Sequence, residues 1–215
     1  MTELITPKRR YTSTRRRTQA NETRKQIIDA AKKIFFMQGY SGATIDSIAQ
    51  EAGVSPETVY AVFGNKRTIL SNLINVSVGG DNQPIPLLKR SGPQAVLHEN
   101  DPIRVIDLFA QDISAILERV APVMEITRYA AKTEPDIANL LKNMLDQRME
   151  NLRVIPRHLS ALGALREGLD VAQATEIIWV ITSPEVFILL LRDRGWSKET
   201  YVQWLSDTLI RLLLP

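Results

Sequence analysis

The sequence of 215 residues predicts an all-α protein. Along most of the chain, apolar residues recur every three or four positions, which is the spacing of one buried face of a helix. Two of these segments begin with a capping residue followed by proline, at Ser55-Pro56 and Asp101-Pro102, a pair that favours the start of a helix. No stretch bounded by turns alternates apolar and polar residues, so we expect no β-sheet.

Four helices are expected before residue 79, and glycines or capping residues mark most of their ends. The expected spans are 21–38 followed by Gly39, 45–52 between Thr44 and Gly53, 56–63 between Ser55 and Gly64, and 65–74 starting at Asn65-Lys66. Residues 21–78 are therefore predicted to form one helical domain.

Glycine and proline then accumulate, and residues 79–101 are predicted to be a connection with at most one short turn of helix. The helical pattern resumes at Asp101-Pro102, so residues 102–215 are predicted to form a second helical domain. Its expected helices are 102–120, 122–132, 135–162, 171–182, 184–193 and 198–213. Pro156 is expected to kink the longest of them.

The composition excludes several classes of protein. The absence of cysteine removes disulfides, thiolate metal sites and cysteine nucleophiles. The two histidines, His98 and His158, have no carboxylate at metal-ligand spacing, and the glycine motifs of nucleotide-binding loops are missing, so we expect no enzyme, no metal and no cofactor. No apolar run approaches the roughly 20 residues that cross a bilayer, and the N-terminus does not resemble a secretory signal, so we expect a cytoplasmic protein.

Positive charge is concentrated near the N-terminus. Residues 1–80 carry 12 Lys and Arg against 6 Asp and Glu, whereas residues 81–215 carry 15 against 18. Six of the basic residues lie in residues 1–20, which are predicted to be a flexible arm. A basic arm on a near-neutral body indicates a polyanionic partner, nucleic acid before membrane, and the alternative is a solvated terminus.

Residues 45–63 have the plan of a helix-turn-helix, in which two short helices are joined by a tight turn that contains glycine. The turn is Ala52-Gly53-Val54-Ser55, where Gly53 permits the sharp reversal and Val54 is placed to fill the angle between the helices. The plan lies within the basic part of the chain, between two further helices and behind the basic arm. Together these features indicate DNA binding.

This segment resembles the N-terminal DNA-binding domain of the TetR/AcrR family of bacterial transcriptional regulators, over roughly residues 24–72. The residues that match at the family spacing are Thr44, Ile48-Ala49, Ala52-Gly53-Val54-Ser55, Thr58, Tyr60, Phe63, Lys66 and Leu70. The C-terminal two-thirds resembles the family more loosely, by length and helix pattern. The resemblance implies that the helix at 56–63 lies in the major groove with its first residues nearest the base edges.

The DNA contacts that the resemblance implies divide by chemistry. We expect phosphate contacts from Thr44, Tyr60 and Lys66. We expect contacts with base edges from Glu57 and Thr58. The full expected set is Thr44, Ser55, Pro56, Glu57, Thr58, Tyr60 and Lys66, with Arg15, Arg16 and Arg17 following the backbone or entering a minor groove. For Thr44 and Ser55 the alternative is a purely capping role, and for Tyr60 it is an ordinary surface aromatic.

Two positions depart from the family pattern. Glu57 stands where the family often has a small residue, and an acid beside phosphates is repelled unless it meets a donor. Val62 stands where many members carry histidine, so one usual phosphate contact is expected to be missing.

For the second domain, the resemblance implies ligand binding and dimerisation. Apolar stripes predict a homodimer through 171–193 and 198–213, and the alternative is that these stripes close the core of the chain itself. A ligand pocket is expected among the helices 102–120, 122–132 and 135–162. The candidate ligand contacts are Phe109, Met124, Arg128, Met144, Arg148 and Trp179, for which the alternative is plain core or a structural ion pair.

The function expected from these observations is a homodimeric transcriptional repressor that binds a palindromic double-stranded DNA operator. A small-molecule effector of unknown identity is expected to release it from the operator. The alternative is an architectural helical protein that coats DNA without reading its sequence.

Overall fold

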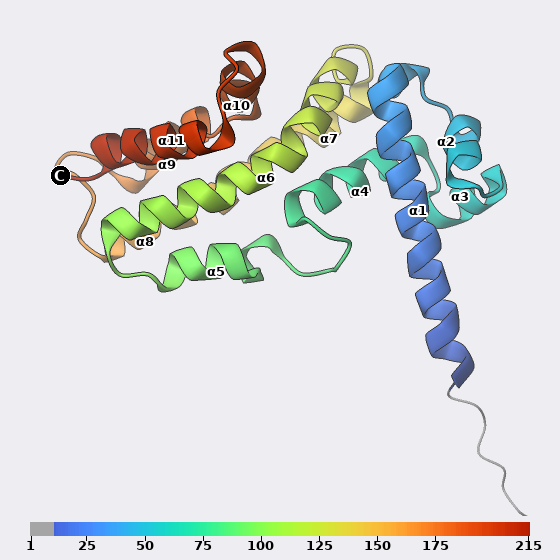
Figure 1. The fold of residues 1–215 in the computed structure, drawn as a ribbon, viewed down its shortest axis with the longest axis horizontal. Coiled ribbons are helices and arrows are strands. Elements are labelled where there is room, and N and C mark those ends of the chain that lie inside the picture. Colours follow the sequence, from blue (N-terminus) through green and yellow to red (C-terminus); the bar gives the residue numbers. More distant parts are fainter. Residues whose placement is uncertain (1–10) are drawn as a thin grey trace, which may run out of the picture. The chain divides into compact units, whose positions relative to one another are not determined.

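The computed structural model describes the backbone of residues 11–215 and the side chains of residues 16–215. Residues 1–10 of the predicted arm and the side chain of Arg15 lie outside the described part. Every regular element between residues 11 and 215 is a helix, which confirms the all-α class (Figure 1). The elements are α1 (Tyr11–Gly42), α2 (Ile45–Ala52), α3 (Pro56–Phe63), α4 (Lys66–Gly79), the 3₁₀ turn η1 (Leu87–Lys89), α5 (Ser91–His98), α6 (Pro102–Ala130), α7 (Pro135–Leu152), α8 (Val154–Ala161), α9 (Val171–Ile181), α10 (Pro184–Ile188), the π-helical turn η2 (Leu189–Asp193) and α11 (Lys198–Leu213).

Tertiary contacts divide the chain into an N-terminal unit that ends at Ile69 and a C-terminal unit that starts at Leu70. The boundary falls inside α4, whose first turn belongs to the N-terminal unit and whose remaining turns belong to the C-terminal unit. The boundary predicted from the sequence lies instead at the far end of this helix. α4 is therefore the element that both units share.

The first helix starts earlier than the sequence predicts. α1 begins at Tyr11 and continues through Gly39, where a φ of 69° marks a kink. Residues 11–20, expected to belong to a flexible arm, are helical. The prediction failed here because this segment carries no apolar stripe, which is the signal that predicts the other helices. From residue 27 onward the stripe is present and buried, with Phe35 fully inaccessible to solvent.

α6 is the central helix of the C-terminal unit, and α5, α7, α10 and α11 pack against it (Figure 1). The predicted division into two helices before Pro122 is wrong, because α6 runs unbroken across it. Pro122 lies on the exposed side of the helix, whereas Ala121 and Val123 are fully buried. The burial of this face outweighs the one backbone hydrogen bond that proline removes.

Residues 79–101 contain more helix than predicted, since η1 and the eight-residue α5 lie within them. Gly92 and Pro93 suggest a loop, but both fall in the first turn of α5, where proline is tolerated. Gly92 lies against α6. A Cβ atom at this position would come within 1.9 Å of Asp112 Oδ1, so any side chain here would displace the Asp112 carboxylate.

The predicted kink near Pro156 is confirmed as a break between α7 and α8 at Arg153. A proline ring clashes with the carbonyl group four residues before it, which here belongs to Leu152, the last residue of α7. The break therefore precedes the proline by one turn.

The segment Val171–Asp193 is long and apolar enough to cross a membrane by composition, with a mean hydropathy of 1.7, and 33% of the window is buried. In the fold it is not one continuous α-helix. α9 ends at Ile181, and Ser183 caps α10 by accepting a hydrogen bond from the Val186 N–H. The segment packs as part of the C-terminal unit, although much of its apolar surface stays exposed.

We expect the substitution Gly92→Ala to lower the free energy of unfolding by about 1–3 kcal/mol, because the added methyl group displaces the Asp112 side chain that packs against α5. Gly42→Ala is the control, since nothing lies closer than 3.4 Å to a Cβ there. Urea unfolding of both variants checks the expectation. Equal stability of the two variants would contradict the close packing described at Gly92.

Candidate nucleic-acid interface and ligand cavities

Thr44 fixes the start of α2 through a reciprocal pair of hydrogen bonds. The Ser47 N–H donates to Thr44 Oγ1 at 3.0 Å, and the Thr44 N–H donates to Ser47 Oγ at 3.1 Å. α2 ends at Gly53, whose φ of 66° is the left-handed conformation that reverses the chain toward α3. The predicted capping role of Thr44 is confirmed.

Ser55 caps α3 and Pro56 occupies its first position, as the sequence predicts. The Thr58 N–H donates to Ser55 Oγ at 3.3 Å, and the two hydroxyl groups lie 3.2 Å apart. The cap directs the Ser55 and Thr58 side chains toward each other at the beginning of the helix. Their hydroxyl groups therefore lie at the end of α3 that is expected to be nearest the bases.

α3 has one buried and one exposed face. Val59 is fully buried and Phe63 is 5% exposed. The Arg24 guanidinium lies 4.6 Å from the centre of the Phe63 ring, a cation–π contact between α1 and α3. The opposite face carries Glu57 and Tyr60, the latter 55% exposed. This is the face that the sequence predicts to meet DNA.

The Glu57 carboxylate is held at the N-terminal end of α3. Hydrogen bonds from its own backbone N–H and from the Ser55 hydroxyl lower its pKa below the ordinary value. Glu57 is therefore ionised at neutral pH, and it places a negative charge beside the hydroxyl groups of Ser55 and Thr58.

Lys66 has a structural role that sequence reasoning missed. Its Nζ donates to the carbonyl oxygens of Tyr40 and Ala43 at 2.7 and 2.8 Å, and it lies 4.3 Å from the centre of the Tyr40 ring. These carbonyl groups lie where α1 ends, so Lys66 satisfies acceptors that the helix leaves without partners. A phosphate contact by the same ammonium group stays a prediction.

The remaining predicted contacts differ in exposure. Arg16 and Arg17 are exposed on the first turns of α1, and Pro56 is half-buried beside the cap of α3. The structure thus brings Ser55, Pro56, Glu57, Thr58 and Tyr60 together on α3.

The predicted ligand contacts do not form one pocket. Phe109 lies on the wall of a partly enclosed cavity of about 40 Å³ between α5, α6, α7 and α8. Met124 is 4% exposed within α6, and Met144 is half-buried in α7. Arg128 borders a separate, open groove of about 430 Å³ between α6 and α7, and forms an ion pair with Glu185.

Arg148 and Trp179 meet at a third place, the end of α9. Arg148 Nη2 donates to the Trp179 carbonyl oxygen and to Thr182 Oγ1, both at 2.9 Å, and the guanidinium lies 5.2 Å from the centre of the Trp179 ring. Burial lowers the pKa of Arg148 to about 10, so it stays charged at neutral pH. These contacts favour the structural alternative for Arg148, since they tie α7 to the end of α9.

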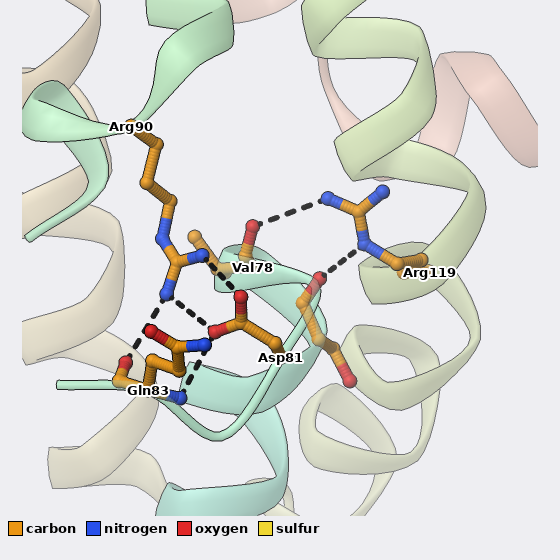
Figure 2. A network of polar contacts seen from close by, with 6 residues as sticks. Val78, Asp81, Gln83, Arg90 and Arg119 are labelled. Carbon is orange, nitrogen blue, oxygen red and sulfur yellow. Dashed lines mark hydrogen bonds and ion pairs between the residues drawn. The ribbon is translucent and has the colours of Figure 1, made fainter. Parts of the chain in front are cut away.

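A polar network holds the end of α4 to the rest of the C-terminal unit (Figure 2). Arg119 of α6 donates through Nε to the Ser77 carbonyl oxygen at 3.0 Å and through Nη2 to that of Val78 at 3.3 Å. In the following loop, Arg90 binds both carboxylate oxygens of Asp81, at 2.9 and 3.1 Å. Arg119 does not figure among the residues that the sequence singles out, because its acceptors are main-chain atoms that sequence patterns do not show.

Residues 27–73, which contain the two short helices and their turn, match the family model described as bacterial regulatory proteins, tetR family. The chain is 46% identical over 56 residues to the HTH-type transcriptional regulator SrpR of Pseudomonas putida, covering 26% of each protein. It is 25% identical over 205 residues to the uncharacterized HTH-type transcriptional regulator YdeS of Bacillus subtilis, covering 91% of this chain and 98% of the relative. Over this segment the chain is similar to the DNA-binding domain of the TetR family.

Similarity to solved TetR-family regulators extends over both units. The fold matches NalD, the secondary repressor of the MexAB-OprM multidrug efflux pump of Pseudomonas aeruginosa, with a TM-score of 0.66 at 20% identity, covering 91% of this chain and 98% of that one. It matches FadR of Bacillus subtilis, solved in complex with stearoyl-CoA, with a TM-score of 0.67 at 21% identity, covering 87% and 97%. These matches show a shared fold.

The matches to the Pseudomonas regulators cover only part of each relative. The aligned part of this chain spans 26% of SrpR and 42% of TtgW, another regulator of Pseudomonas putida. The relatives are transcriptional regulators and not enzymes, in agreement with the prediction for this chain.

We expect Ser55→Ala to lower the free energy of unfolding by about 1 kcal/mol, because α3 loses its cap. Ser55→Asn is the matched control, since asparagine also caps helices and should retain the stability. Thermal unfolding of both variants provides the measurement. If the alanine variant is as stable as the wild type, the cap does not contribute as described.

Replacement of Lys66 by methionine is expected to destabilise the N-terminal unit by about 2 kcal/mol, because the Tyr40 and Ala43 carbonyl groups lose a charged donor. Arg67→Met, at the exposed neighbouring position, should change stability by less than about 0.5 kcal/mol. Chemical unfolding followed by circular dichroism compares the two. Matching losses would show that the carbonyl contacts of Lys66 are energetically unimportant.

Proposed function

We propose that this chain is a cytoplasmic repressor of the TetR family that binds a palindromic operator as a homodimer and leaves it when a small molecule binds. The observation that carries the proposal is the exposed polar face of α3. The helix is capped at its N-terminal end, and Val59 and Phe63 on its opposite face are buried. A helix of this kind presents its first residues to the base edges of the major groove.

The proposed DNA contacts have separate tasks. Thr58 and Glu57 read bases, the former by its methyl group against thymine and the latter by accepting from the cytosine amino group. Thr44 and Tyr60 contact phosphates and position the helix, together with Lys66. Arg15, Arg16 and Arg17 add sequence-independent attraction to the DNA backbone.

Two copies of the chain are proposed to dimerise through residues 171–193 and 198–213. The contacts come from apolar side chains that remain exposed in the single chain. Val180 is 54% exposed and Leu189 is 51% exposed, within a segment of high mean hydropathy. The stripes expected from the sequence to form the seam are partly used inside the chain, since Ile178 and Leu205 are fully buried. The proposed interface is therefore the outward face of these two segments, on which Val180 of α9 and Leu189 of η2 are the most exposed of the apolar residues. Pairing of two helix-turn-helix units also supplies the specificity that one short helix lacks.

A small molecule is proposed to release the protein from its operator. The cavities of the C-terminal unit and the ligand of a structural relative support this proposal. FadR of Bacillus subtilis is described in complex with stearoyl-CoA, and NalD is described as a repressor of an efflux pump. If ligand and operator favour different states of the dimer, each lowers the affinity for the other by the same factor.

Selection of bound sequences from a random pool of DNA duplexes, at physiological salt, tests the proposed function. Enrichment of a palindrome with half-sites at least about one helical turn apart supports a dimeric sequence-specific regulator. Salt-sensitive binding without enrichment supports the alternative, an architectural protein that coats DNA, because phosphate contacts alone carry no sequence information.

On the selected operator, Tyr60→Ala is expected to weaken binding to all sequences by a similar factor, about tenfold, whereas Thr58→Ala and Glu57→Gln should change the preferred bases. The Tyr60 side chain is exposed, so its removal should cost little stability. The loss of DNA affinity should therefore appear without a change in unfolding temperature. Repeating the selection with each variant measures both effects. A Tyr60 variant that shifts the consensus, or a Thr58 variant that keeps it, would reverse the assigned tasks.

A further inference from the structure

The first turns of α1 extend beyond the packed part of the helix. Residues 16–26 are exposed or half-buried, and the buried stripe starts at Ile27 and Ile28. Within α1 the backbone departs from helical dihedral angles at Gly39, so residues 11–38 share one helical register. The direction in which each side chain of residues 16–26 leaves the helix is therefore fixed relative to the packed turns.

Arg24 marks the side of α1 that faces α3. Its guanidinium group lies 4.6 Å from the centre of the ring of Phe63, the last residue of α3. Tyr60, for which a phosphate contact is proposed, lies in the same half of α3. The side of α1 that carries Arg24 thus adjoins the C-terminal half of α3.

Arg17 leaves α1 on this same side. It precedes Arg24 by a spacing that is about 20° short of two helical turns and about 10 Å along the axis. Arg16 points about a quarter turn away from this direction, and Glu22, the one acidic residue of residues 16–26, points nearly half a turn away from Arg24. Figure 1 shows these first turns of α1 extending past α2 and α3. The side that adjoins α3 therefore carries two guanidinium groups and no carboxylate.

We propose that Arg17 binds one phosphate of the DNA strand that borders the major groove occupied by α3, and that α1 holds it there as part of a continuous helix. The place of α3 in the groove rests on the proposed function. Arg17 lies about 10 Å along α1 from the contact with Phe63, which is comparable with the roughly 12 Å width of the groove, so its side chain reaches the strand at the edge. A guanidinium group binds phosphate through two parallel N–H donors. Arg16 leaves the helix in another direction and contributes screened attraction without a direct contact.

The contact is tested by fluorescence anisotropy with the full chain and the selected operator, at several salt concentrations. Arg17→Gln is expected to weaken binding by about tenfold or more at physiological salt, because a charge-assisted hydrogen bond is lost. It should also lower the steepness of log K against log salt by about 1 for each protomer.

Arg16→Gln is the matched control, since it removes the same charge from the neighbouring exposed position. Its loss of affinity is expected to stay below about threefold, because screened attraction alone is removed. An arm without a fixed register would use both arginines alike. Equal losses in the two variants, or a larger loss for Arg16→Gln, would overturn the proposal.

Two substitutions at Ala20 separate the helical register from the charge. Ala20 is exposed between Arg17 and Arg24, and a proline ring at this position clashes with the carbonyl group of Arg16. Ala20→Pro keeps every charge and should reproduce the loss caused by Arg17→Gln. Ala20→Gln preserves the helix and should bind as the wild type does. Both variants leave the packed turns unchanged, so their unfolding temperatures should agree, and the proposal fails if both bind DNA equally well.

The phosphate contact and the proposed function fail separately when a duplex of unrelated sequence is added as a second target. An enriched operator that Arg17→Gln and Arg16→Gln bind equally well refutes the contact and leaves the regulator intact. A loss confined to Arg17→Gln on the unrelated duplex, without any enriched operator, supports the contact and refutes sequence-specific regulation.

Discussion

Two guanidinium groups lie at the C-terminal end of α4 and fix the path of the chain there, Arg119 on the helix itself and Arg90 on the loop that follows. The last carbonyl groups of a helix have no partner within the helix, and those of Ser77 and Val78 receive the N–H groups of Arg119. Arg90, paired with Asp81, lies so close that a Cβ atom on Gly79 would be 2.8 Å from its Nη2 atom. Because α4 begins in the N-terminal unit and ends in the C-terminal unit, these contacts fix the far end of the one helix that the units share.

The continuity of α6 connects the features of the C-terminal unit. Phe109 and Asp112 border the cavity, Arg119 reaches the end of α4, and Arg128 pairs with Glu185, all from a single helix. Packed helices move as rigid bodies and not by gradual bending, so a shift of α6 at the cavity also displaces Arg119, two turns farther along. A break before Pro122 would leave this section intact but would separate Arg128 from it.

Local signals in the sequence predicted most of the helix ends, because Thr44, Ser55 and Asp101 cap helices by contacts within three residues. The errors arose where tertiary packing decided the outcome. Gly92 lies within a helix that packs against Asp112 of α6 and does not mark a loop. The helix tolerates Pro122 because the neighbouring Ala121 and Val123 are buried. For the candidate site, the exposed residues of α3 were predictable from the period of the helix. The carbonyl partners of Lys66 were not, because main-chain acceptors distant in sequence leave no pattern.

In the proposed complex with DNA, Glu57 raises selectivity, and the positive charge of the N-terminal region offsets the repulsion that its carboxylate causes. Residues 1–80 carry an excess of six positive charges, which supplies attraction to any DNA regardless of sequence. An ionised carboxylate at the start of α3 opposes that attraction locally, and the repulsion is relieved only where a base offers a donor. Specificity is a difference between affinities, and a residue that weakens binding to the wrong sequence raises it as effectively as one that strengthens binding to the right one. With valine at position 62 in place of the histidine that the family pattern favours, the proposed interface relies less on phosphate contacts from α3 and more on this discrimination.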